Sequence, residues 1–361
     1  MLEELKDYRD PALCLDLAGK IRDISAEPFN IMEVCGGHTY AIRKNGIHKI
    51  TGENINFMSG PGCPVCVTPT ADIDKAVELA SVKGAVVCSF GDLIHVPGSE
   101  KSLAEARAGS GNVRAVYSVY DVLGFARAEP GKNFIFISVG FETTAPAAAA
   151  AVIRADEDGL GNFFVLALNK TMPAALKAVL GDARSKVHAL LCPGHVSTIT
   201  GSLIYRSLVD ETGVSCCITG FEPFDILRAV FELALAREKG EARLINAYER
   251  AVNDDGNRKA RSVMSEVFEE SDSVWRGLGA IPGSGLRLKE KYERFDAEKN
   301  FPLETRPAEE NAGCICGSIL RGISKPPDCP LFRTVCSPDN PAGACMVSSE
   351  GACGAWYKYG E

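Results

Sequence analysis

The sequence lacks the features that would place it on a nucleic acid or in a membrane. It has 39 Lys and Arg against 47 Asp and Glu, a formal net charge of −8, so no basic excess is present for a phosphate backbone or an anionic lipid surface. Its longest weakly polar run, residues 145–153, is about half of a membrane span. The first ten residues are charged and contain no apolar segment typical of a signal peptide. We therefore expect a soluble, cytoplasmic protein that binds neither nucleic acid nor membrane.

Cysteine, by contrast, is abundant and is concentrated near the C-terminus. The chain has 14 cysteines, six of them between residues 314 and 353, and residues 325–354 contain five prolines and few large apolar side chains. Such a segment offsets its loss of conformational entropy only when a covalent or metallic crosslink holds it. In a reducing compartment these cysteines indicate metal ligands, redox thiols or small buried side chains, and not a structural disulfide framework.

Short apolar runs alternate with amphipathic segments between residues 29 and 221. We expect strands at residues 30–34, 55–58, 85–90, 113–119, 134–139, 163–168, 189–191 and 215–219. Nearly continuous apolar runs are typical of strands that are covered on both faces, and the apolar spacing of residues 72–80 predicts a helix between two of them. This alternation predicts an α/β fold with two doubly wound, Rossmann-like parallel-sheet domains.

The pattern divides the chain into four expected parts. Residues 1–127 would form an N-terminal helix and the first α/β domain, and residues 128–235 the second α/β domain. The strand pattern stops after residue 224, so residues 236–300 are expected to be a helical connecting segment that packs on both domains. Residues 301–361 would form a small, irregular, cysteine-rich lobe.

The spacing of the C-terminal cysteines differs from that of common zinc sites, which use closely paired cysteine hooks. The wide spacing and the absence of histidine in this segment favour a four-thiolate iron–sulfur cluster, with zinc or reduced structural cysteines as the alternatives. Four ligands would leave two thiols over, and these would form a disulfide beside the cluster. The six cysteines are Cys314, Cys316, Cys329, Cys336, Cys345 and Cys353.

Cys63 and Cys66 form the motif CPVC between an expected strand and an expected helix. A helix start lowers the pKa of a thiol, because the helix dipole favours the thiolate. The proline between the two cysteines stiffens the loop. The motif therefore indicates dithiol exchange or metal ligation.

Cys35 and His38 lie in the motif CGGH, directly after the first expected strand. The two glycines allow the backbone to approach a ligand closely. A thiolate and an imidazole at this spacing would bind a soft or borderline metal, or His38 would activate Cys35. Cys192 and His195 repeat the pattern as CPGH at another strand end, where a loop role is favoured and His195 is a candidate for the same cleft.

Two expected strands end in the same three residues, Gly-Phe-Glu, and a helix follows each of them. The helix dipole alone favours an acid at this position. The carboxyl ends of strands are also where doubly wound sheets bind ligands. Glu142 and Glu222 are therefore candidate proton donors or partner contacts.

Taken together, these motifs closely resemble the HypD family of [NiFe]-hydrogenase maturation factors over essentially the whole chain. The segments that carry the resemblance are MEVCGGHT, GPGCPVCVTP, GFETTAP, CPGHVSTITG, PPDCPLF, NPAGAC and GACGAW. The resemblance implies a cytoplasmic maturation scaffold with redox activity, on which an iron atom acquires two cyanides and one carbon monoxide. It implies as partners the iron-bridging chaperone HypC and the cyanide donor HypE, with HypF upstream, and a monomer within that heterocomplex.

The resemblance also assigns roles to the cysteines. Cys35 corresponds to the iron-binding cysteine of the family, with His38 as a second ligand or an acid–base group, and Cys63 and Cys66 correspond to its essential pair. The lobe is similar to the redox centre of ferredoxin:thioredoxin reductase, which implies a [4Fe–4S] cluster. By that analogy the cluster ligands are Cys314, Cys329, Cys336 and Cys353, and the adjacent redox pair is Cys316 and Cys345.

Two other functions fit the same residues. An iron–sulfur thiol–disulfide reductase would use Cys63 and Cys66 for exchange and would assemble no iron. A zinc-stabilised adaptor would be colourless and would hold zinc in the C-terminal lobe. Iron analysis and a visible spectrum of the purified protein separate the three.

Overall fold

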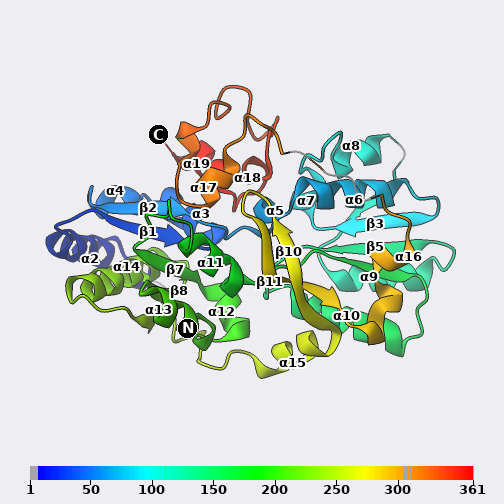
Figure 1. The fold of residues 1–361 in the computed structure, drawn as a ribbon, viewed down its shortest axis with the longest axis horizontal. Coiled ribbons are helices and arrows are strands. Elements are labelled where there is room, and N and C mark those ends of the chain that lie inside the picture. Colours follow the sequence, from blue (N-terminus) through cyan, green and yellow to red (C-terminus); the bar gives the residue numbers. More distant parts are fainter. Residues whose placement is uncertain (1–6, 110, 305–307, 309, 361) are drawn as a thin grey trace.

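The computed structural model describes residues 7–109, 111–304, 308 and 310–360 of the chain. Two parallel sheets lie side by side, and a small irregular lobe lies over the region between them (Figure 1). The expected fold class, an α/β protein with two parallel-sheet domains and an irregular C-terminal region that contains cysteines, is confirmed.

The first sheet contains five parallel strands, and all its neighbouring strands pair in parallel. Its strand order is β2 (Ile55–Ser59), β1 (Phe29–Glu33), β7 (Ala189–Pro193), β8 (Ser215–Thr219) and β9 (Leu244–Asn246). The helices that pack on it are α2 (Pro11–Ile24), α3 (Gly36–Lys44), α4 (Ile47–Ile50), α11 (Met172–Leu180), α12 (Gly194–Thr200), α13 (Arg206–Thr212) and α14 (Pro223–Glu238), with the 3-10 turn η1 (Leu203–Tyr205).

The second sheet contains four parallel strands. Its strand order is β4 (Val113–Ala115), β3 (Ala85–Ser89), β5 (Asn133–Ser138) and β6 (Phe163–Ala167). The elements that pack on it are α6 (Thr70–Ser81), α7 (Gly91–Ile94), α8 (Leu103–Ala108), α9 (Val119–Ala128), α10 (Ala145–Glu157), α15 (Arg258–Val267), η2 (Glu290–Phe295) and α16 (Ala297–Asn300).

All eight strands expected from the apolar runs are present, with ends that differ by a few residues. The largest difference is at the fourth, which ends at Ala115 and not at residue 119. Ser118 caps α9 together with Asp121, so the chain turns into a helix before the apolar run ends. The helix expected at residues 72–80 is α6, which buries Ile73, Ala76, Val77 and Ala80 on one face.

The chain visits the first sheet twice. It forms β1 and β2, crosses to the second sheet for β3 to β6, and returns to the first sheet for β7 to β9. The boundary expected between residues 127 and 128 falls between β4 and β5, which belong to the same sheet. Apolar runs predict where strands occur but do not specify which strands pair, so a division in chain order cannot represent this insertion.

The segment expected to be a helical connection contains strands as well as helices. Residues 242–251 include the edge strand β9, and residues 268–288 form an antiparallel hairpin of β10 (Phe268–Trp275) and β11 (Gly279–Leu288). Residues 280–285, which contain Gly and Pro, lie within β11. A register shift between Ser271 and Ser273 accommodates this irregular strand, and such shifts are where Gly and Pro are tolerated in sheets.

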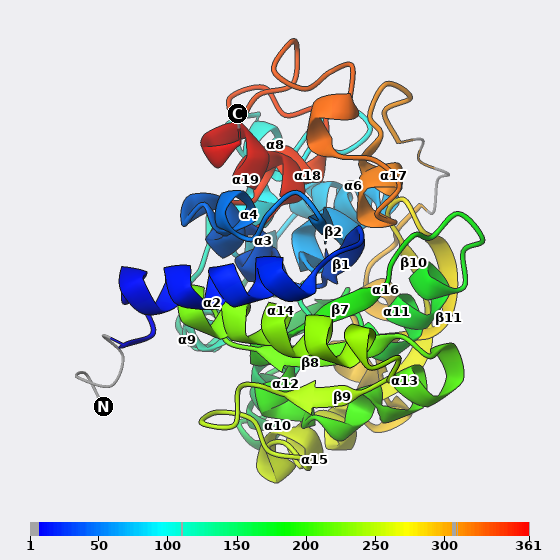
Figure 2. The same cartoon turned by 90° about the vertical axis from the view of Figure 1, so that its left-hand side faces the viewer.

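The C-terminal lobe contains short helices joined by irregular chain. Its elements are α17 (Cys316–Leu320), η3 (Pro326–Asp328), α18 (Ala344–Val347) and α19 (Ala352–Tyr359). Figure 2 shows α18 and α19 above α3 and α4, on the side of the first sheet.

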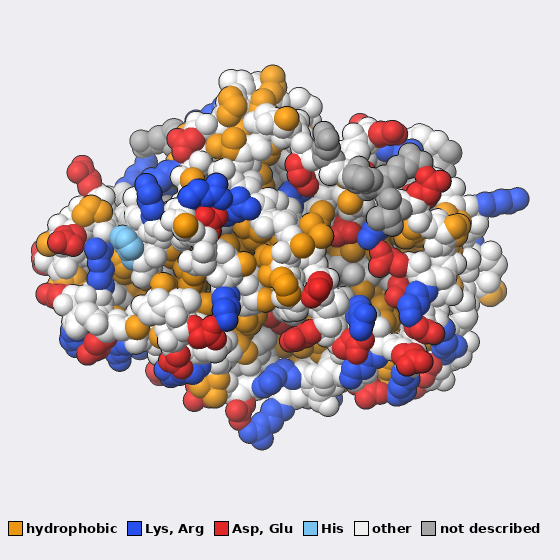
Figure 3. Space-filling model, in the orientation of Figure 1, with side chains coloured by type: hydrophobic (Ala, Val, Ile, Leu, Met, Phe, Trp, Pro, Cys, Tyr) orange, Lys and Arg blue, Asp and Glu red, His pale blue; other side chains and the backbone are white. Residues whose placement is uncertain are grey.

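No helix in the described part of the chain is both long and apolar enough to span a membrane. On the face shown in Figure 3, Lys and Arg side chains are interspersed with Asp and Glu.

Candidate functional site

Cys35 lies in a tight turn between β1 and α3. It is the N-cap residue of α3, and the two glycines of CGGH form the first turn of that helix. Gly36 N–H donates to the carbonyl oxygen of Gly62, 3.1 Å away. A Cβ atom at Gly62 would lie 2.2 Å from Cys35 N, so no larger residue fits this contact. The turn that carries Cys35 therefore packs directly on the loop that precedes Cys63.

The thiol of Cys35 is held in its protonated form. Burial raises its pKa to about 12, and the negative charge of Glu350 adds to this effect. Backbone hydrogen bonds from Gly37 and His38 act in the opposite direction but do not cancel it. A bound cation would reverse the balance, since a thiol that ligates a metal loses its proton.

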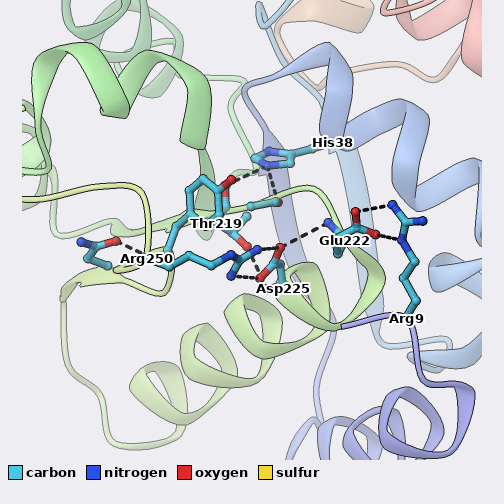
Figure 4. Close-up of polar contacts among 9 residues, drawn as sticks. Arg9, His38, Thr219, Glu222, Asp225 and Arg250 are labelled. Carbon is cyan, nitrogen blue, oxygen red and sulfur yellow. Dashed lines mark hydrogen bonds and ion pairs between the residues drawn. The ribbon is translucent and has the colours of Figure 1, made fainter. Parts of the chain in front are cut away.

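His38 is fully buried and presents one ring nitrogen without a partner. Its Nε2 lies 3.1 Å from the carbonyl oxygen of Gly220 and 3.3 Å from that of Thr219 (Figure 4). Both neighbours only accept hydrogen bonds, so Nε2 carries the proton and donates. Burial lowers the pKa of His38 to about 4, so the ring is neutral at pH 7. Among the described residues, the buried Nδ1 has no hydrogen-bond partner, and its lone pair is available to a ligand.

Phe221 connects the two histidine motifs. Its ring stacks on His38 at a centroid distance of 4.7 Å and on His195 at 4.1 Å. His195 therefore lies next to the CGGH site, with the Phe221 ring in contact with both histidines. The Gly-Phe-Glu repeat pointed to the glutamates and not to Phe221 as a residue of the site. In the sequence, Phe221 is marked only by its place in Gly-Phe-Glu, directly after the strand that ends at Thr219.

Cys63 and Cys66 lie at the start of the short helix α5 (Pro64–Val67) and are joined in a disulfide. Cys66 N–H donates to Cys63 Sγ at 3.2 Å, as expected for a sulfur at a helix N-cap. Both residues are buried, and they belong to the same apolar cluster as Cys316 and Cys345.

The six cysteines of the lobe line a single pocket. The other lining residues include the apolar side chains of Ile319, Leu331, Phe332 and Met346. The Sγ atoms of Cys316 and Cys345 lie 2.9 Å apart. Burial, together with the neighbouring cysteines, raises the pKa of Cys314 to about 11. The cysteines that line the pocket are Cys314, Cys316, Cys329, Cys336, Cys345 and Cys353.

This donor set fits a four-thiolate iron–sulfur cluster. Thiolates are the ligands that such clusters take, and an apolar surround limits their contact with water. Binding iron would remove the protons that burial now holds on the thiols. Within the described residues, no group of three Cys, His, Asp or Glu side chains meets the geometry of a site for one metal ion.

The lobe packs on both the CGGH and the CPVC segments. The Arg43 guanidinium of α3 lies 3.5 Å from the ring centroid of Trp356 in α19, and Tyr359 Oη donates to Tyr40 Oη at 3.0 Å. A Cβ atom at Gly36 would lie 2.1 Å from the carbonyl oxygen of Glu350. On the other side, α18 packs on α5. The structure thus brings the three cysteine-bearing regions together.

The two glutamates of the Gly-Phe-Glu repeat lie in different environments. Glu142 is buried, its Oε1 accepts from Met172 N–H at 3.0 Å, and its Oε2 has no partner among the described residues. Burial raises the pKa of Glu142 to about 7. Glu222 is partly exposed and forms two 2.6 Å hydrogen bonds with Arg9, which lower the pKa of Glu222 (Figure 4). Only Glu142 is held as a neutral acid near pH 7.

Arg250 supports the loop that contains Glu222 and Phe221. Its guanidinium makes a two-pronged ion pair with Asp225, at 2.7 and 2.5 Å, and the Asp225 side chain is almost fully buried. Asp225 also accepts the backbone N–H of Glu222 and completes a capping box at the start of α14. These residues fix the strand end that supplies the two carbonyl oxygens to His38.

Comparison with known proteins gives one consistent result. A family profile described as "HypD: Hydrogenase formation hypA family" matches residues 12–360. A hydrogenase maturation factor HypD of Azotobacter vinelandii is 42% identical, over 99% of this chain and 97% of its own length. The HypD protein of Escherichia coli is 39% identical over 98% and 97% of the two chains, and a putative hydrogenase expression/formation protein of Methanocaldococcus jannaschii is 42% identical over 98% and 99%. The chain therefore belongs to the HypD family of hydrogenase maturation factors.

Proposed function

We propose that the protein is a cytoplasmic scaffold on which the Fe(CN)₂CO group of [NiFe]-hydrogenases is assembled. In this proposal the protein holds the iron together with HypC and accepts cyanide from HypE, with HypF acting upstream of HypE. The observation that carries the proposal is the meeting of three cysteine-bearing regions, at Cys35, at Cys63 and Cys66, and in the six-thiol lobe. Membership of the HypD family supports the same function.

The iron atom is the cargo, and Cys35 and His38 are its proposed ligands. A low-spin ferrous ion that carries cyanide and carbon monoxide is stabilised by soft, electron-rich donors such as thiolates. Cys35 would supply a thiolate and His38 the lone pair of Nδ1, which is already free of a proton and of any partner among the described residues. Because Cys35 must lose its proton to ligate iron, affinity for iron should rise with pH.

The lobe is proposed to provide electrons to the Cys63–Cys66 pair. Cys314, Cys329, Cys336 and Cys353 would hold a [4Fe–4S] cluster, which when bound supplies single-electron transfer. The 2.9 Å separation of Cys316 Sγ and Cys345 Sγ supports their assignment as the redox pair. Their shared apolar cluster with Cys63 and Cys66 supports exchange between the two pairs.

Glu142 is proposed as a proton donor, since burial raises its pKa to about 7 and keeps it protonated up to about that pH. Glu222 is proposed as a contact for a partner, since its ion pair with Arg9 keeps it ionised at the surface. Reductive removal of sulfur from a delivered cyanide consumes both protons and electrons, so a buried acid and a dithiol suit that step.

The experiment is to purify the protein anaerobically with HypC and to record its infrared spectrum. Cyanide and carbon monoxide stretching bands are expected from the native chain and from Cys14→Ala, a buried cysteine of α2 outside the site. They should be absent from Cys35→Ala. Bands that persist in Cys35→Ala would contradict the iron-ligand assignment.

A thiol–disulfide reductase is the second candidate, and the packing of the lobe on the Cys63–Cys66 disulfide favours it. It predicts turnover of a protein disulfide without HypC and no diatomic stretching bands. The infrared spectrum and a disulfide-reduction assay on the same preparation therefore distinguish the two functions.

A further inference from the structure

The tip of the β10–β11 hairpin, residues 276–278, lies between two cysteine-bearing regions. The hairpin runs between the two sheets toward α5 and the C-terminal lobe (Figure 1). Trp275, the residue before the tip, is buried, and its indole N–H donates to Ser284 Oγ at 2.8 Å. A hydrogen bond within the hairpin therefore anchors the residue that precedes the tip.

Arg276 binds the end of the CPVC helix through three hydrogen bonds. Its backbone N–H donates to the carbonyl oxygen of Val67 at 2.8 Å, directly after Cys66. Its Nε donates to the carbonyl oxygen of Thr68 at 2.9 Å, and its Nη2 donates to Thr70 Oγ1 at 2.8 Å. Arg276 is 5% exposed. This arginine satisfies the carbonyl groups that α5 leaves free at its C-terminus.

The next residue, Gly277, contacts the lobe through its backbone. Its φ is +75°, and a Cβ atom there would lie 2.3 Å from Gly317 Cα. A Cβ atom at Gly317 would in turn lie 2.9 Å from Gly277 Cα. Because Gly317 directly follows Cys316, the hairpin and the redox pair of the lobe meet backbone to backbone. Neither glycine position has room for a side chain.

We propose that the hairpin tip is a positioning element that holds the Cys63–Cys66 disulfide and the Cys316–Cys345 pair in register for exchange with each other. Two consecutive residues, Arg276 and Gly277, each contact one of the two regions, so any displacement of one region is transmitted to the other. This inference rests on the proposed function, because it requires that the lobe reduces Cys63–Cys66.

The exchange between the two cysteine pairs transfers two electrons and two protons and needs no other reactant. The thiols of Cys316 and Cys345 lose two electrons and two protons and form a disulfide bond. The bond between Cys63 and Cys66 breaks, and each of its sulfurs takes one electron and one proton. A low-potential single-electron donor then returns the lobe pair to the dithiol in two steps, and dithionite serves as that donor in the test.

The test follows both pairs in the full-length protein. Dithionite is added anaerobically to protein in which both the Cys63–Cys66 and the Cys316–Cys345 pairs have been oxidised to disulfides. Samples are alkylated under denaturing conditions at intervals, and mass spectrometry counts the free thiols at each cysteine. The variants are Arg276→Met, Arg276→Lys and Gly277→Ala. The matched control is Arg287→Met, an exposed arginine of the same hairpin that pairs with Glu269.

In Arg276→Met and in Gly277→Ala, dithionite should reduce the Cys316–Cys345 pair at the native rate. The visible absorption of both variants should remain that of the native chain. Reduction of Cys63–Cys66 should slow by about a hundredfold, the effect of a displacement of about 1 Å between reacting groups. Arg276→Lys should recover part of the rate, because lysine keeps one donor for the carbonyl oxygens. Arg287→Met should behave as the native chain.

Native rates for Cys63–Cys66 in both Arg276→Met and Gly277→Ala would overturn the proposal. Loss of visible absorption, or equal slowing of both pairs, would also overturn it, because the tip would then serve assembly of the lobe. If the native chain reduces its lobe pair but never Cys63–Cys66, the proposed relay fails first, and the role of the tip fails with it.

Discussion

Phe221 stacks on His38 with ring centroids 4.7 Å apart, and this contact orients the imidazole that the CGGH motif supplies. The ring is held from three directions, by the Phe221 face, by the carbonyl oxygens of Thr219 and Gly220, and by its own helix α3. These contacts orient the His38 ring so that Nε2 faces the two carbonyl oxygens and Nδ1 faces away from them. The end of β8 therefore determines which nitrogen of a residue near β1 can reach a ligand.

Replacing Phe221 with alanine should weaken ferrous iron binding while the protein remains folded. An aromatic pair is worth about 0.5–1.5 kcal/mol beyond its buried area, which corresponds to at most about a tenfold loss of affinity. Equilibrium iron binding under anaerobic conditions measures it. The matched control is Phe224→Ala, a partly buried phenylalanine that packs edge-on against Tyr8. Equal loss of iron affinity in the two variants would contradict a role for the His38 stack.

The two ion pairs of the Glu222 loop should contribute very differently to stability. Asp225 is almost fully buried, so Arg250→Ala would leave its charge without a cation and should lower the free energy of unfolding by about 3 kcal/mol. Arg9→Ala should have little measurable effect, since Arg9 is exposed to solvent and Glu222 is partly exposed. Urea denaturation of the two variants measures both changes. Similar losses would show that the burial of Asp225 is not what makes its pair important.

The lobe cysteines should divide into two classes when they are replaced one at a time by serine. Cys329→Ser or Cys336→Ser should abolish the visible absorption expected from the proposed cluster, because each removes a proposed thiolate ligand. Cys316→Ser or Cys345→Ser should retain the absorption and lose only the redox pair. Iron and sulfide analysis of the anaerobically purified variants provides the measurement. Stoichiometric loss of iron and sulfide from Cys316→Ser would refute this division of the six thiols.

The strands β1 to β8 were predictable from the sequence because each is a short apolar run with helices on both faces. The hairpin was not, because β10 is mostly polar and β11 contains Gly283 and Gly285. Its stability comes from cross-strand pairing and from packing between the two sheets, which local pattern does not encode. The return of the chain to the first sheet at β7 was missed for a similar reason.

The same distinction applies to the site. The cysteine and histidine motifs could be identified because their residue types and spacing carry the chemistry. Phe221 and Arg276 could not, since each acts through contacts with segments far away in the chain. The Gly-Phe-Glu repeat predicted similar roles for Glu142 and Glu222, yet only burial distinguishes a neutral acid from a paired carboxylate.

Glu142 should make the protein less stable as pH rises toward neutrality. The folded chain holds its proton up to a pKa of about 7, whereas the unfolded chain loses it near the ordinary value of 4.5. Between these values the unfolded state binds fewer protons, so increasing pH favours unfolding. The contribution is fully present below pH 4.5 and lost as pH passes 7, a total of about 3 kcal/mol. Urea denaturation at pH 5 and pH 8 measures it.

Glu142→Gln should remove this pH dependence, because glutamine resembles the protonated acid and cannot ionise. The variant should be more stable than the native chain by only about 1 kcal/mol at pH 5 and by about 3 kcal/mol at pH 8. Glu222→Gln is the matched control from the second Gly-Phe-Glu, where Arg9 lowers the pKa, so it should not flatten the profile. If Glu142→Gln and the native chain keep parallel profiles from pH 5 to pH 8, Glu142 is not the buried acid that titrates near neutrality.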